Sequence, residues 1–382
     1  MDRNFQPNEW RTVMPAELSI STSQAPAADQ FVDYPACWYL FGASADVRKR
    51  PVSKKTLGRQ LVAFRTASGK LTVMDANCAH MGADLGCGHI VGETIQCPFH
   101  SWRYGADGVC KHIPGAGGNS IPSFARLRTY PVAERHGYVF FFNGTQPLFP
   151  LPFFFGEYPT DYVGGGLFRY VADCNWYMNA AHAFDMQHFA SVHERELIGP
   201  PEVDYPAPFS RRNRYLAKVV GRSVFDRLLR RFVGKTVEIT ISVSGGAFLM
   251  VTGNFGRAHS RFIIAAQPLE DGQTLCEGIV FARSTGVPLL DKLNLAVRKM
   301  FTHGYLAAEA RQLRGTRYNP RSLGPTDLDM IEFFQWVACL PQTAPTSTQF
   351  STSEGRYEDN DRRLVVPMDR GSASTTARAA TE

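Results

Sequence analysis

Two short motifs in the first third of the chain bring together residues that bind metals. A cysteine and a histidine stand one residue apart at Cys78 and His80, and a second such pair stands two residues apart at Cys97 and His100. A [2Fe–2S] cluster can be held by two thiolates on one iron and two imidazoles on the other. Two tight loops that meet at their tips would supply this set, each giving one ligand of each type. Residues with turn chemistry stand around both motifs: Gly82, Gly86, Gly88 and Pro98.

Zinc is the alternative metal for these four residues. Two cysteines and two histidines also suit tetrahedral zinc. Zinc modules usually pair cysteine with cysteine and histidine with histidine, whereas each half of the present set is mixed. We therefore interpret the set as an iron–sulfur site and keep zinc as the alternative.

A second group of candidate ligands lies in the second half of the chain. The segment 176–196 has apolar residues at helical spacing, and it contains Asp185, His188 and His193. The two histidines can converge on one metal if the helix ends or bends between them. A carboxylate from elsewhere would complete a facial triad, which leaves positions on Fe(II) open for dioxygen and a substrate. A pair of histidines on a helix is by itself more often structural than metal-binding.

The chain as a whole has the size and composition of a two-domain globular protein. It has 382 residues, of which 44% are hydrophobic, and no apolar run has the length of a membrane span. The start of the sequence lacks the pattern of a signal peptide, so we expect a cytoplasmic protein. Eight scattered cysteines in so long a chain do not indicate a disulfide scaffold, and those outside the two motifs are expected to be free thiols.

The elements that must position these residues differ between the two halves of the chain. Residues 1–30 are expected to be irregular, and residues 31–146 to form a small antiparallel β domain that holds the cysteine–histidine loops. Residues 147–345 are expected to form an α+β domain, with an antiparallel sheet flanked by helices. The polar tail 346–382 is expected to be disordered. The predicted strands are 60–65, 70–75, 137–143, 237–243, 247–252 and 261–266, and the further predicted helices are 289–314 and 328–340.

Much of the net charge of +6 comes from the segment 211–235, which contains seven arginines. We interpret it first as a solvated face and second as a docking patch for an acidic electron-transfer partner. Membrane contact through the amphipathic stretch 224–232 is the third interpretation. A nucleic-acid role is not expected, because the segment lacks aromatic stacking platforms and belongs to no recognised binding module.

Together these motifs resemble those of the Rieske non-haem iron oxygenases. The stretches from Cys78 and from Cys97 follow the C-x-H-x-G-x-x-L and C-P-x-H-x-W-x-[FY]-x-x-x-G patterns of Rieske proteins. Asp-x-x-His-x4-His after Asn175 and Trp176 is similar to the family's iron motif. The resemblance covers roughly residues 35–340, and several motif segments are similar to those of members that oxidise aryl amines. It implies an N-terminal antiparallel β Rieske domain followed by an α+β catalytic domain.

The resemblance also implies a role for each matching residue. Cys78 and Cys97 would hold one iron of the cluster, and His80 and His100 would hold the other. The mononuclear iron would be held by His188 and His193. Asp185 matches an aspartate that links a cluster histidine of one subunit to an iron-binding histidine of its neighbour, which implies a homotrimer. Such a carboxylate would orient both imidazoles and give the electron a short path.

The chain departs from the family pattern at two places. The usual Glu-Asn before the bridging aspartate is replaced by Ala181-His182, and the role of His182 is left open between a polar partner of the site, a plain helix histidine and a competing ligand. The third iron ligand is usually an aspartate from a late helix. The best match in this chain is Glu309, and its rivals are Asp327 and Asp329.

The function implied is that of a terminal oxygenase that activates O2 at Fe(II) with electrons from the cluster. The chain has no dinucleotide-binding fingerprint and no plant-type ferredoxin motif, so NAD(P)H would act only through a separate reductase, with or without a ferredoxin. We expect an aromatic or hydrophobic substrate, and aryl amine N-oxidation, hydroxylation, oxidative demethylation or cyclisation as the reaction. The alternatives are an electron-transfer protein without oxygenase turnover and a degenerate member that binds a ligand without turnover.

Overall fold

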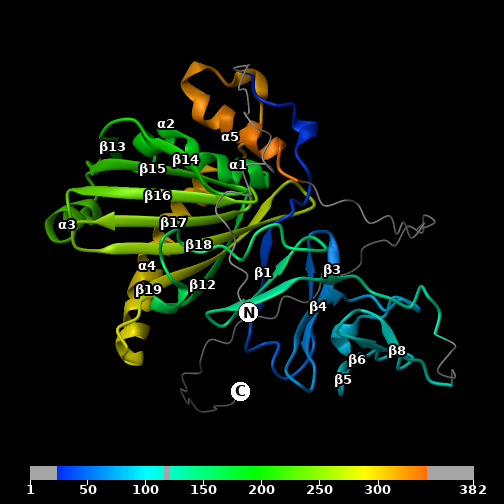
Figure 1. Ribbon diagram of the computed structural model, residues 1–382. Helices are drawn as coiled ribbons and strands as arrows, with labels where there is room; N and C mark the ends of the chain where they lie inside the picture. Colours follow the sequence, from blue (N-terminus) through cyan, green and yellow to red (C-terminus); the bar gives the residue numbers. More distant parts are fainter. Residues whose placement is uncertain (1–23, 116–120, 342–382) are drawn as a thin grey trace, which may run out of the picture. The chain divides into compact units, whose positions relative to one another are not determined.

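The computed structural model describes residues 24–115 and 121–341 (Figure 1). Most of the irregular lead-in expected for residues 1–30 and all of the tail expected at 346–382 lie outside the described residues. Short 3₁₀ turns of the described chain include η2 (Ala28–Gln30), η4 (Pro159–Asp161), η6 (Pro320–Ser322) and η7 (Pro325–Asp327). In the described ranges, none of the helices combines the length and apolar character that crossing a lipid bilayer requires.

Three small antiparallel sheets occupy the first half of the chain. The first has the order β1 (Trp38–Ala43), β11 (Tyr138–Phe142), β10 (Val132–Arg135), and the second has the order β2 (Val52–Thr56), β3 (Arg59–Arg65), β4 (Leu71–Asp75), β9 (Thr129–Tyr130). The third contains β5 (His89–Val91), β6 (Thr94–Gln96), β7 (Arg103–Gly105) and β8 (Cys110–His112) in sequence order, beside the turn η3 (Leu85–Cys87). The strands predicted at 60–65, 70–75 and 137–143 correspond to β3, β4 and β11.

A single antiparallel sheet of eight strands dominates the second half. Its order is β12 (Tyr162–Ala172), β19 (Thr274–Arg283), β18 (His259–Pro268), β17 (Phe248–Phe255), β16 (Thr236–Ser244), β15 (Ser210–Val219) and β13 (Arg195–Leu197), and β14 (Glu202–Ala207) pairs with β15. The predicted α+β fold class, with an antiparallel sheet and flanking helices, is therefore confirmed.

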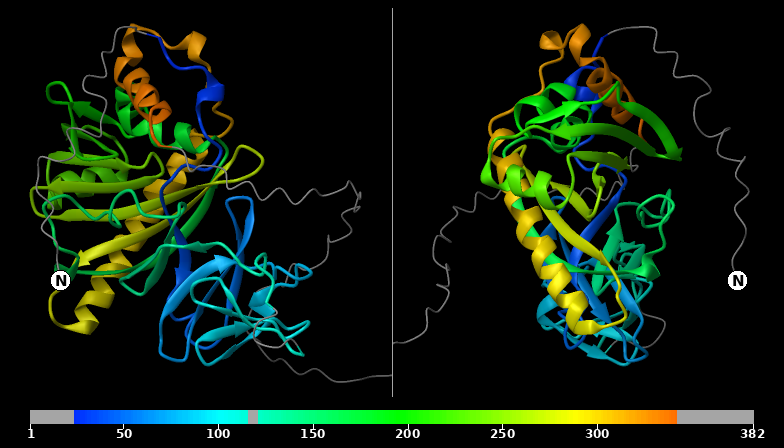
Figure 2. Two further views of the ribbon diagram at one scale, coloured as in Figure 1. Left: turned by 45° about the vertical axis from the view of Figure 1, so that its right-hand side comes forward. Right: turned by 90° about the vertical axis from the view of Figure 1, so that its left-hand side faces the viewer.

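The long helix α4 (Pro288–Gln312) crosses one face of this sheet over β12 and β19 (Figure 2). The shorter helix α5 (Leu328–Ala338) contacts α1 (Trp176–Ala181), and α3 (Val224–Phe232) connects β15 to β16. Both late helices lie where the sequence predicted them, at 289–314 and 328–340. The helix α1 follows β12, whereas α4 comes after β19, more than 100 residues later in the chain. Residues far apart in the sequence therefore meet where α4 packs on the sheet.

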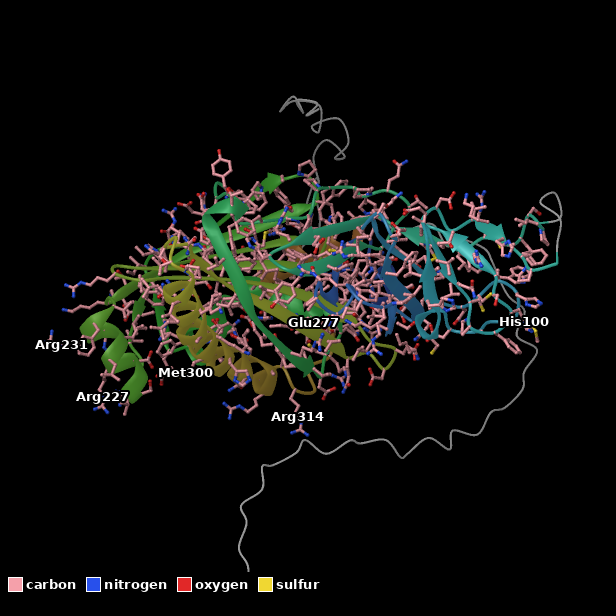
Figure 3. All side chains as sticks on the ribbon, turned by 90° about the horizontal axis from the view of Figure 1, so that it is seen from below. His100, Arg227, Arg231, Glu277, Met300 and Arg314 are labelled. Carbon is pink, nitrogen blue, oxygen red and sulfur yellow. The ribbon has the colours of Figure 1, made fainter. Side chains whose placement is uncertain are left out.

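Two hydrophobic clusters underlie the two candidate sites. The larger cluster joins β1 and β11 to the eight-stranded sheet; in it, the ring of Phe140 lies 6.2 Å from that of Phe248. The smaller cluster lies beneath the cysteine–histidine loops and contains the side chains of Phe64, Met74 and Ile95. A buried carboxylate, that of Glu277, also joins the halves: it pairs with Lys54 on β2 at 2.9 Å and with Arg169 on β12 at 2.6 Å (Figure 3).

The segment 176–196 differs from its prediction. A single helix was expected, but α1 ends at Ala181, the 3₁₀ turn η5 (His182–Phe184) follows, and a second short helix, α2 (Met186–Ser191), begins after Asp185. The break occurs because Asp185 has an extended backbone and caps α2, its carboxylate accepting hydrogen bonds from the N–H groups of Gln187 and His188. The strand β13 begins at Arg195, so the prediction of a helix was also wrong for residues 195–196.

The arginine-rich segment is only partly a solvated face. The prediction was wrong for Arg211, which is 1% exposed and bonds Glu332 at 2.9 Å and the hydroxyl of Tyr205 at 3.1 Å. Side chains of β15 alternate between the core and the outside, and Arg211 falls on an inward position of this strand. Arg227 and Arg231, on the outer side of α3, are exposed as expected (Figure 3).

Candidate metal centres

Two tight loops carry the cysteine–histidine motifs. The first follows β4 and closes on itself, because the N–H of Cys78 donates to the carbonyl of Ala83 at 2.9 Å and the N–H of Gly82 donates to the carbonyl of Cys78 at 2.8 Å. The second lies between β6 and β7 and is closed by a hydrogen bond from the N–H of Cys97 to the carbonyl of Trp102 at 2.8 Å. Gly82 has a φ of +77°, a conformation that glycine adopts without strain.

The glycines that follow the first loop allow close contacts. A Cβ atom on Gly88 would lie 2.0 Å from the backbone carbonyl oxygen of Gln96, and one on Gly86 would clash with Ser53. Only glycine therefore lets the two loops approach each other at this distance. The turn chemistry predicted around the motifs thus divides into one glycine that permits a left-handed turn and two that permit close packing.

The loops place their thiols inside and their imidazoles outside. Cys78 and Cys97 are 4% and 1% exposed, and their side chains are neighbours. The rings of His80 and His100 lie 4.6 Å apart at the surface, and the ring of His80 stacks on that of Trp102 at 4.7 Å. Figure 3 shows His100 at the periphery of the molecule. The structure thus brings all four predicted residues together, with an inner pair and an outer pair of donors.

The chemistry of this donor set fits a cluster with two differently ligated irons. Burial raises the pKa of the Cys78 thiol, and a metal ion bound there would stabilise its thiolate form. The hydroxyl of Tyr104 lies 3.1 Å from the sulfur of Cys78, and it accepts a hydrogen bond from the N–H of Ala79 at 3.2 Å. A hydroxyl in this position can donate a hydrogen bond to a ligating sulfur, which is one of the ways in which a protein tunes a cluster.

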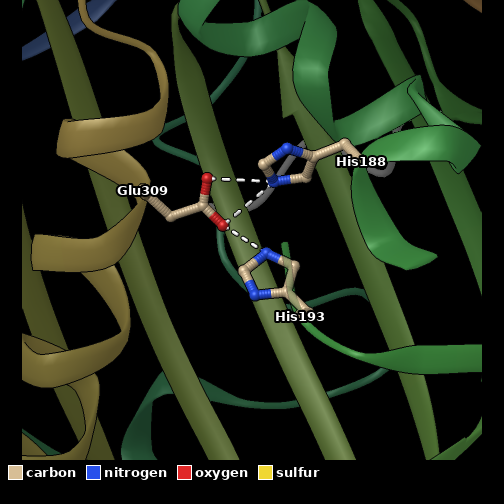
Figure 4. Close-up of side chains that lie close together, drawn as sticks. All are labelled: His188, His193 and Glu309. Carbon is tan, nitrogen blue, oxygen red and sulfur yellow. Dashed lines mark hydrogen bonds and ion pairs between the residues drawn. The ribbon is translucent and has the colours of Figure 1, made fainter. Parts of the chain in front are cut away.

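Three side chains from separate elements form the second candidate centre (Figure 4). Glu309 extends from α4 toward His188 on α2 and His193 in the turn after α2. The Nε2 atom of His188 lies 3.3 Å from Oε1 and 3.1 Å from Oε2 of Glu309, and the Nε2 atom of His193 makes an ion pair with Oε1. One ligand atom from each of the three residues lies within 4.8 Å of the other two. The end of α2 at Ser191 makes this possible, because it lets the chain turn between the two histidines.

Burial and charge both indicate that this carboxylate faces a cation. Glu309 is 2% exposed, and its buried Oε2 atom lies 3.1 Å from Nε2 of His188. Burial alone would raise the pKa of Glu309, but attraction from His182 and hydrogen bonds from His188 and His193 outweigh it and hold the pKa well below its ordinary value. An ionised, buried carboxylate that converges with two imidazoles fits a divalent iron.

Two further residues belong to this centre. The hydroxyl of Tyr305 lies 3.1 Å from Nε2 of His193, and its ring stacks on the imidazole at 4.5 Å. The Nε2 atom of His182 lies 3.6 Å from Oε2 of Glu309, and burial lowers the pKa of His182. Sequence reasoning left the role of His182 open and missed Tyr305. The spacing could have indicated Tyr305, because it stands four residues before Glu309 on the same helix face.

The remaining predicted residues lie beside the three. Asp185 is half-buried and caps α2, so it fixes the backbone of His188. Asp327 accepts a hydrogen bond from the N–H of Gly324 at 2.9 Å and one from the side chain of Gln187 at 3.4 Å. Burial and the neighbouring Glu332 raise the pKa of Asp329. Neither Asp327 nor Asp329 is part of the three-residue group that the described chain forms.

Comparison with known proteins agrees with this geometry. Residues 37–131 match the family described as Rieske [2Fe-2S] domain. The chain is 39% identical over 142 residues to aminopyrrolnitrin oxygenase PrnD of Pseudomonas fluorescens, a match that covers 36% of this chain and 39% of that protein. It is 36% identical over 171 residues to a probable 3-ketosteroid-9-alpha-monooxygenase oxygenase component of Rhodococcus rhodochrous, covering 42% and 41%. The matches thus span about two fifths of the length of these relatives.

The fold has its own counterparts among solved structures. Apo dicamba monooxygenase aligns with a TM-score of 0.56 at 19% identity, covering 80% of this chain and 97% of that one. NdmA of Pseudomonas putida with caffeine aligns with a TM-score of 0.57 at 18% identity, covering 79% and 89%. The chain therefore contains a Rieske [2Fe–2S] domain and has the fold of dicamba monooxygenase and NdmA. This confirms the iron–sulfur interpretation over zinc, and the similarity to aminopyrrolnitrin oxygenase.

Proposed function

We propose that the chain is the terminal oxygenase component of a multi-component system. The observation that carries this proposal is the convergence of His188, His193 and Glu309 in a chain that also contains a Rieske domain. A protein that only transfers electrons has no use for a second, buried, three-residue site. The relatives that are named as oxygenases or oxygenase components support the same function.

Each metal centre has a proposed set of ligands. Cys78 and Cys97 would hold one iron of the cluster, and His80 and His100 the other. His188, His193 and Glu309 would hold a mononuclear Fe(II), which when bound supplies open positions for O2 beside the substrate. The stacked ring of Tyr305 fixes the imidazole of His193, and the cap made by Asp185 fixes the helix that carries His188. Residues 31–146 would thus serve electron storage, and residues 147–345 the oxidation of the substrate.

The exposed imidazole end of the cluster suits electron transfer between subunits. His80 and His100 lie at the surface, and Asp185 lies beside the mononuclear site in the same chain. We assign Asp185 the bridging role, in which it contacts a cluster histidine of a neighbouring subunit of a homotrimer. Electrons would reach the cluster from NAD(P)H through a separate reductase, with or without a ferredoxin.

The substrate we infer is aromatic or otherwise hydrophobic. Aromatic side chains surround the three-residue site: Phe189 lies 5.5 Å from the ring of His193, and Phe262 lies 6.5 Å from that of Tyr305. Such surroundings favour apolar ligands with few polar groups. The names of two relatives point to an aryl amine and to a steroid, and aryl amine N-oxidation, hydroxylation, oxidative demethylation and cyclisation are the reactions to test.

The proposal is tested by metal content and oxygen consumption. Purified protein should contain about three irons and two labile sulfides per chain, from the ligand sets above. The reduced protein should consume O2 when aryl amines or other aromatics are added, and products should be identified. Two irons per chain and no substrate-dependent consumption would instead support the electron-transfer alternative.

A substitution at Glu309 separates the two centres. Glu309→Ala should lower the iron content from about three to about two per chain, while labile sulfide and the colour of the cluster stay unchanged, because only the mononuclear site loses a ligand. Asp329→Ala is the matched control, since it removes a half-buried carboxylate outside the three-residue group. Full activity of Glu309→Ala, or loss of the third iron in Asp329→Ala, would contradict the ligand assignment.

A further inference from the structure

The two positions at which the chain departs from the family pattern lie next to each other in space. Residue 182 is a histidine where an asparagine is usual, and residue 309 is a glutamate where an aspartate is usual. The Nε2 atom of His182 lies 3.6 Å from Oε2 of Glu309. Both departures put a longer side chain in place of a shorter one. The side chain of His182 extends from η5 and that of Glu309 from α4, each toward the other.

His182 is held in this position from several sides. Its side chain is 19% exposed, and its ring lies 5.4 Å from that of His188. The next residue, Ala183, accepts a hydrogen bond through its carbonyl from the side chain of the buried Asn213 on β15 at 2.9 Å, which ties η5 to the sheet. The Nδ1 atom of His182 is buried without a hydrogen-bond partner, so Nε2 is the ring atom that faces another polar group.

Glu309 presents one of its two carboxylate oxygens to His182. Its Oε1 atom faces His193, whereas its buried Oε2 atom lies 3.1 Å from Nε2 of His188 and 3.6 Å from Nε2 of His182. An imidazole that carries its hydrogen on Nε2 can donate to this oxygen. His182 lies outside the group of three ligand atoms that converge within 4.8 Å, so its place is beside the carboxylate rather than among the ligands.

We propose that His182 is a positioning residue of the metal site: its Nε2–H faces Oε2 of Glu309 and attracts it electrostatically, which holds the carboxylate so that its other oxygen faces the metal. The two departures from the family pattern then work as a pair. An aspartate at position 309 would withdraw the carboxylate by one bond from His182, which already lies at the limit of contact. The inference rests on the proposed function, because it assigns His182 a role toward the mononuclear iron.

The role can be measured through iron binding rather than turnover. Anaerobic titration with Fe(II) gives the affinity of the mononuclear site, and nitric oxide added to the Fe(II) protein with an oxidised cluster gives an EPR signal that reports the geometry of this iron. His182→Leu should weaken Fe(II) binding about 10- to 100-fold and change the signal, as expected when a group that orients a ligand is removed. His182→Gln, whose amide can donate near the position of Nε2, should stay within about threefold of wild type.

A double-mutant cycle tests the pairing itself. In the Glu309→Asp background, His182→Leu should change the Fe(II) affinity less than about threefold, because the shorter carboxylate no longer reaches His182. His303→Leu is the control, since His303 is exposed on α4. Equal, large losses in His182→Leu and His182→Gln would overturn the proposal and make His182 a ligand. Unchanged affinity in His182→Leu, or an equal loss in both backgrounds, would also overturn it. Wild-type protein that binds no Fe(II) beyond its cluster would overturn the proposed function.

Discussion

The hydroxyl of Tyr104 should raise the reduction potential of the cluster. Tyr104 is fully buried, and its oxygen lies 3.1 Å from the sulfur of Cys78. When the cluster takes up an electron, negative charge on its sulfurs increases, so a hydrogen bond to a ligating sulfur stabilises the reduced state more than the oxidised state. Tyr104→Phe removes this hydrogen bond and keeps the ring that fills the core.

The size of the effect follows from the kind of bond. A hydrogen bond to a charged group contributes about 1.5–3 kcal/mol. The thiolate is charged in both redox states, so only part of this, about 1–2 kcal/mol, differs between them. For one electron, about 1.4 kcal/mol corresponds to about 59 mV. We therefore expect the reduction potential of Tyr104→Phe to fall by about 40–90 mV.

A redox titration followed by the EPR signal of the reduced cluster measures this potential. Tyr130→Phe is the matched control: Tyr130 is also buried, but its hydroxyl bonds Asp75 at 2.9 Å and not a cluster sulfur. Labile sulfide must be equal in all variants, because the change also leaves the N–H of Ala79 without its acceptor. A potential of Tyr104→Phe within about 10 mV of the control, or above it, would refute the reasoning.

Two further predictions concern the bridge and the stability of the chain. Asp185→Asn should retain both metal centres, because asparagine also caps helices, but it should slow turnover strongly. Asp185→Ala should in addition lower the free energy of unfolding by about 1 kcal/mol, because the helix cap is lost. Near-normal turnover of Asp185→Asn would exclude the bridging role. Burial, with a contribution from Arg135, lowers the pKa of His136 from 6.5 to about 4, so this group favours unfolding as the pH falls from 6.5 toward 4. Asparagine suits the φ of +50° at residue 136. Between pH 7 and pH 5, His136→Asn should lose about 1 kcal/mol less free energy of unfolding than the wild type, after allowance for partial exposure. Equal losses of both proteins in urea titrations would contradict this.

The candidate ligands with short sequence spacing could be predicted because local chemistry is visible in the chain. Cys78 and His80, or His188 and His193, are near neighbours in the sequence, and residue type and spacing suffice to mark them. The break in the helix predicted for residues 176–196 could not be predicted from residue types and spacing. Apolar residues keep their helical spacing across Asp185, and the break depends on whether its carboxylate caps a new helix.

Contacts between distant segments could not be read from residue types. Arg211 is of a residue type that usually lies at the surface. Its burial is explained only by its inward position on β15, where it contacts Glu332 of α5. Tyr305 has no unusual neighbours in the sequence, and its role follows from the ring of His193 that it meets.

The amino-acid sequence by itself determined the chemistry: two thiols and two imidazoles in mixed pairs, and a pair of histidines with a nearby aspartate. It left three carboxylates as the partner of those histidines, because spacing cannot say which late helix approaches α2. The tertiary structure decided this, since α4 crosses the sheet and carries Glu309 to His188 and His193, while Asp327 and Asp329 stay at the start of α5. It also decided that His182 meets Glu309, because a contact between segments so far apart in the chain exists only once the sheet has brought them together.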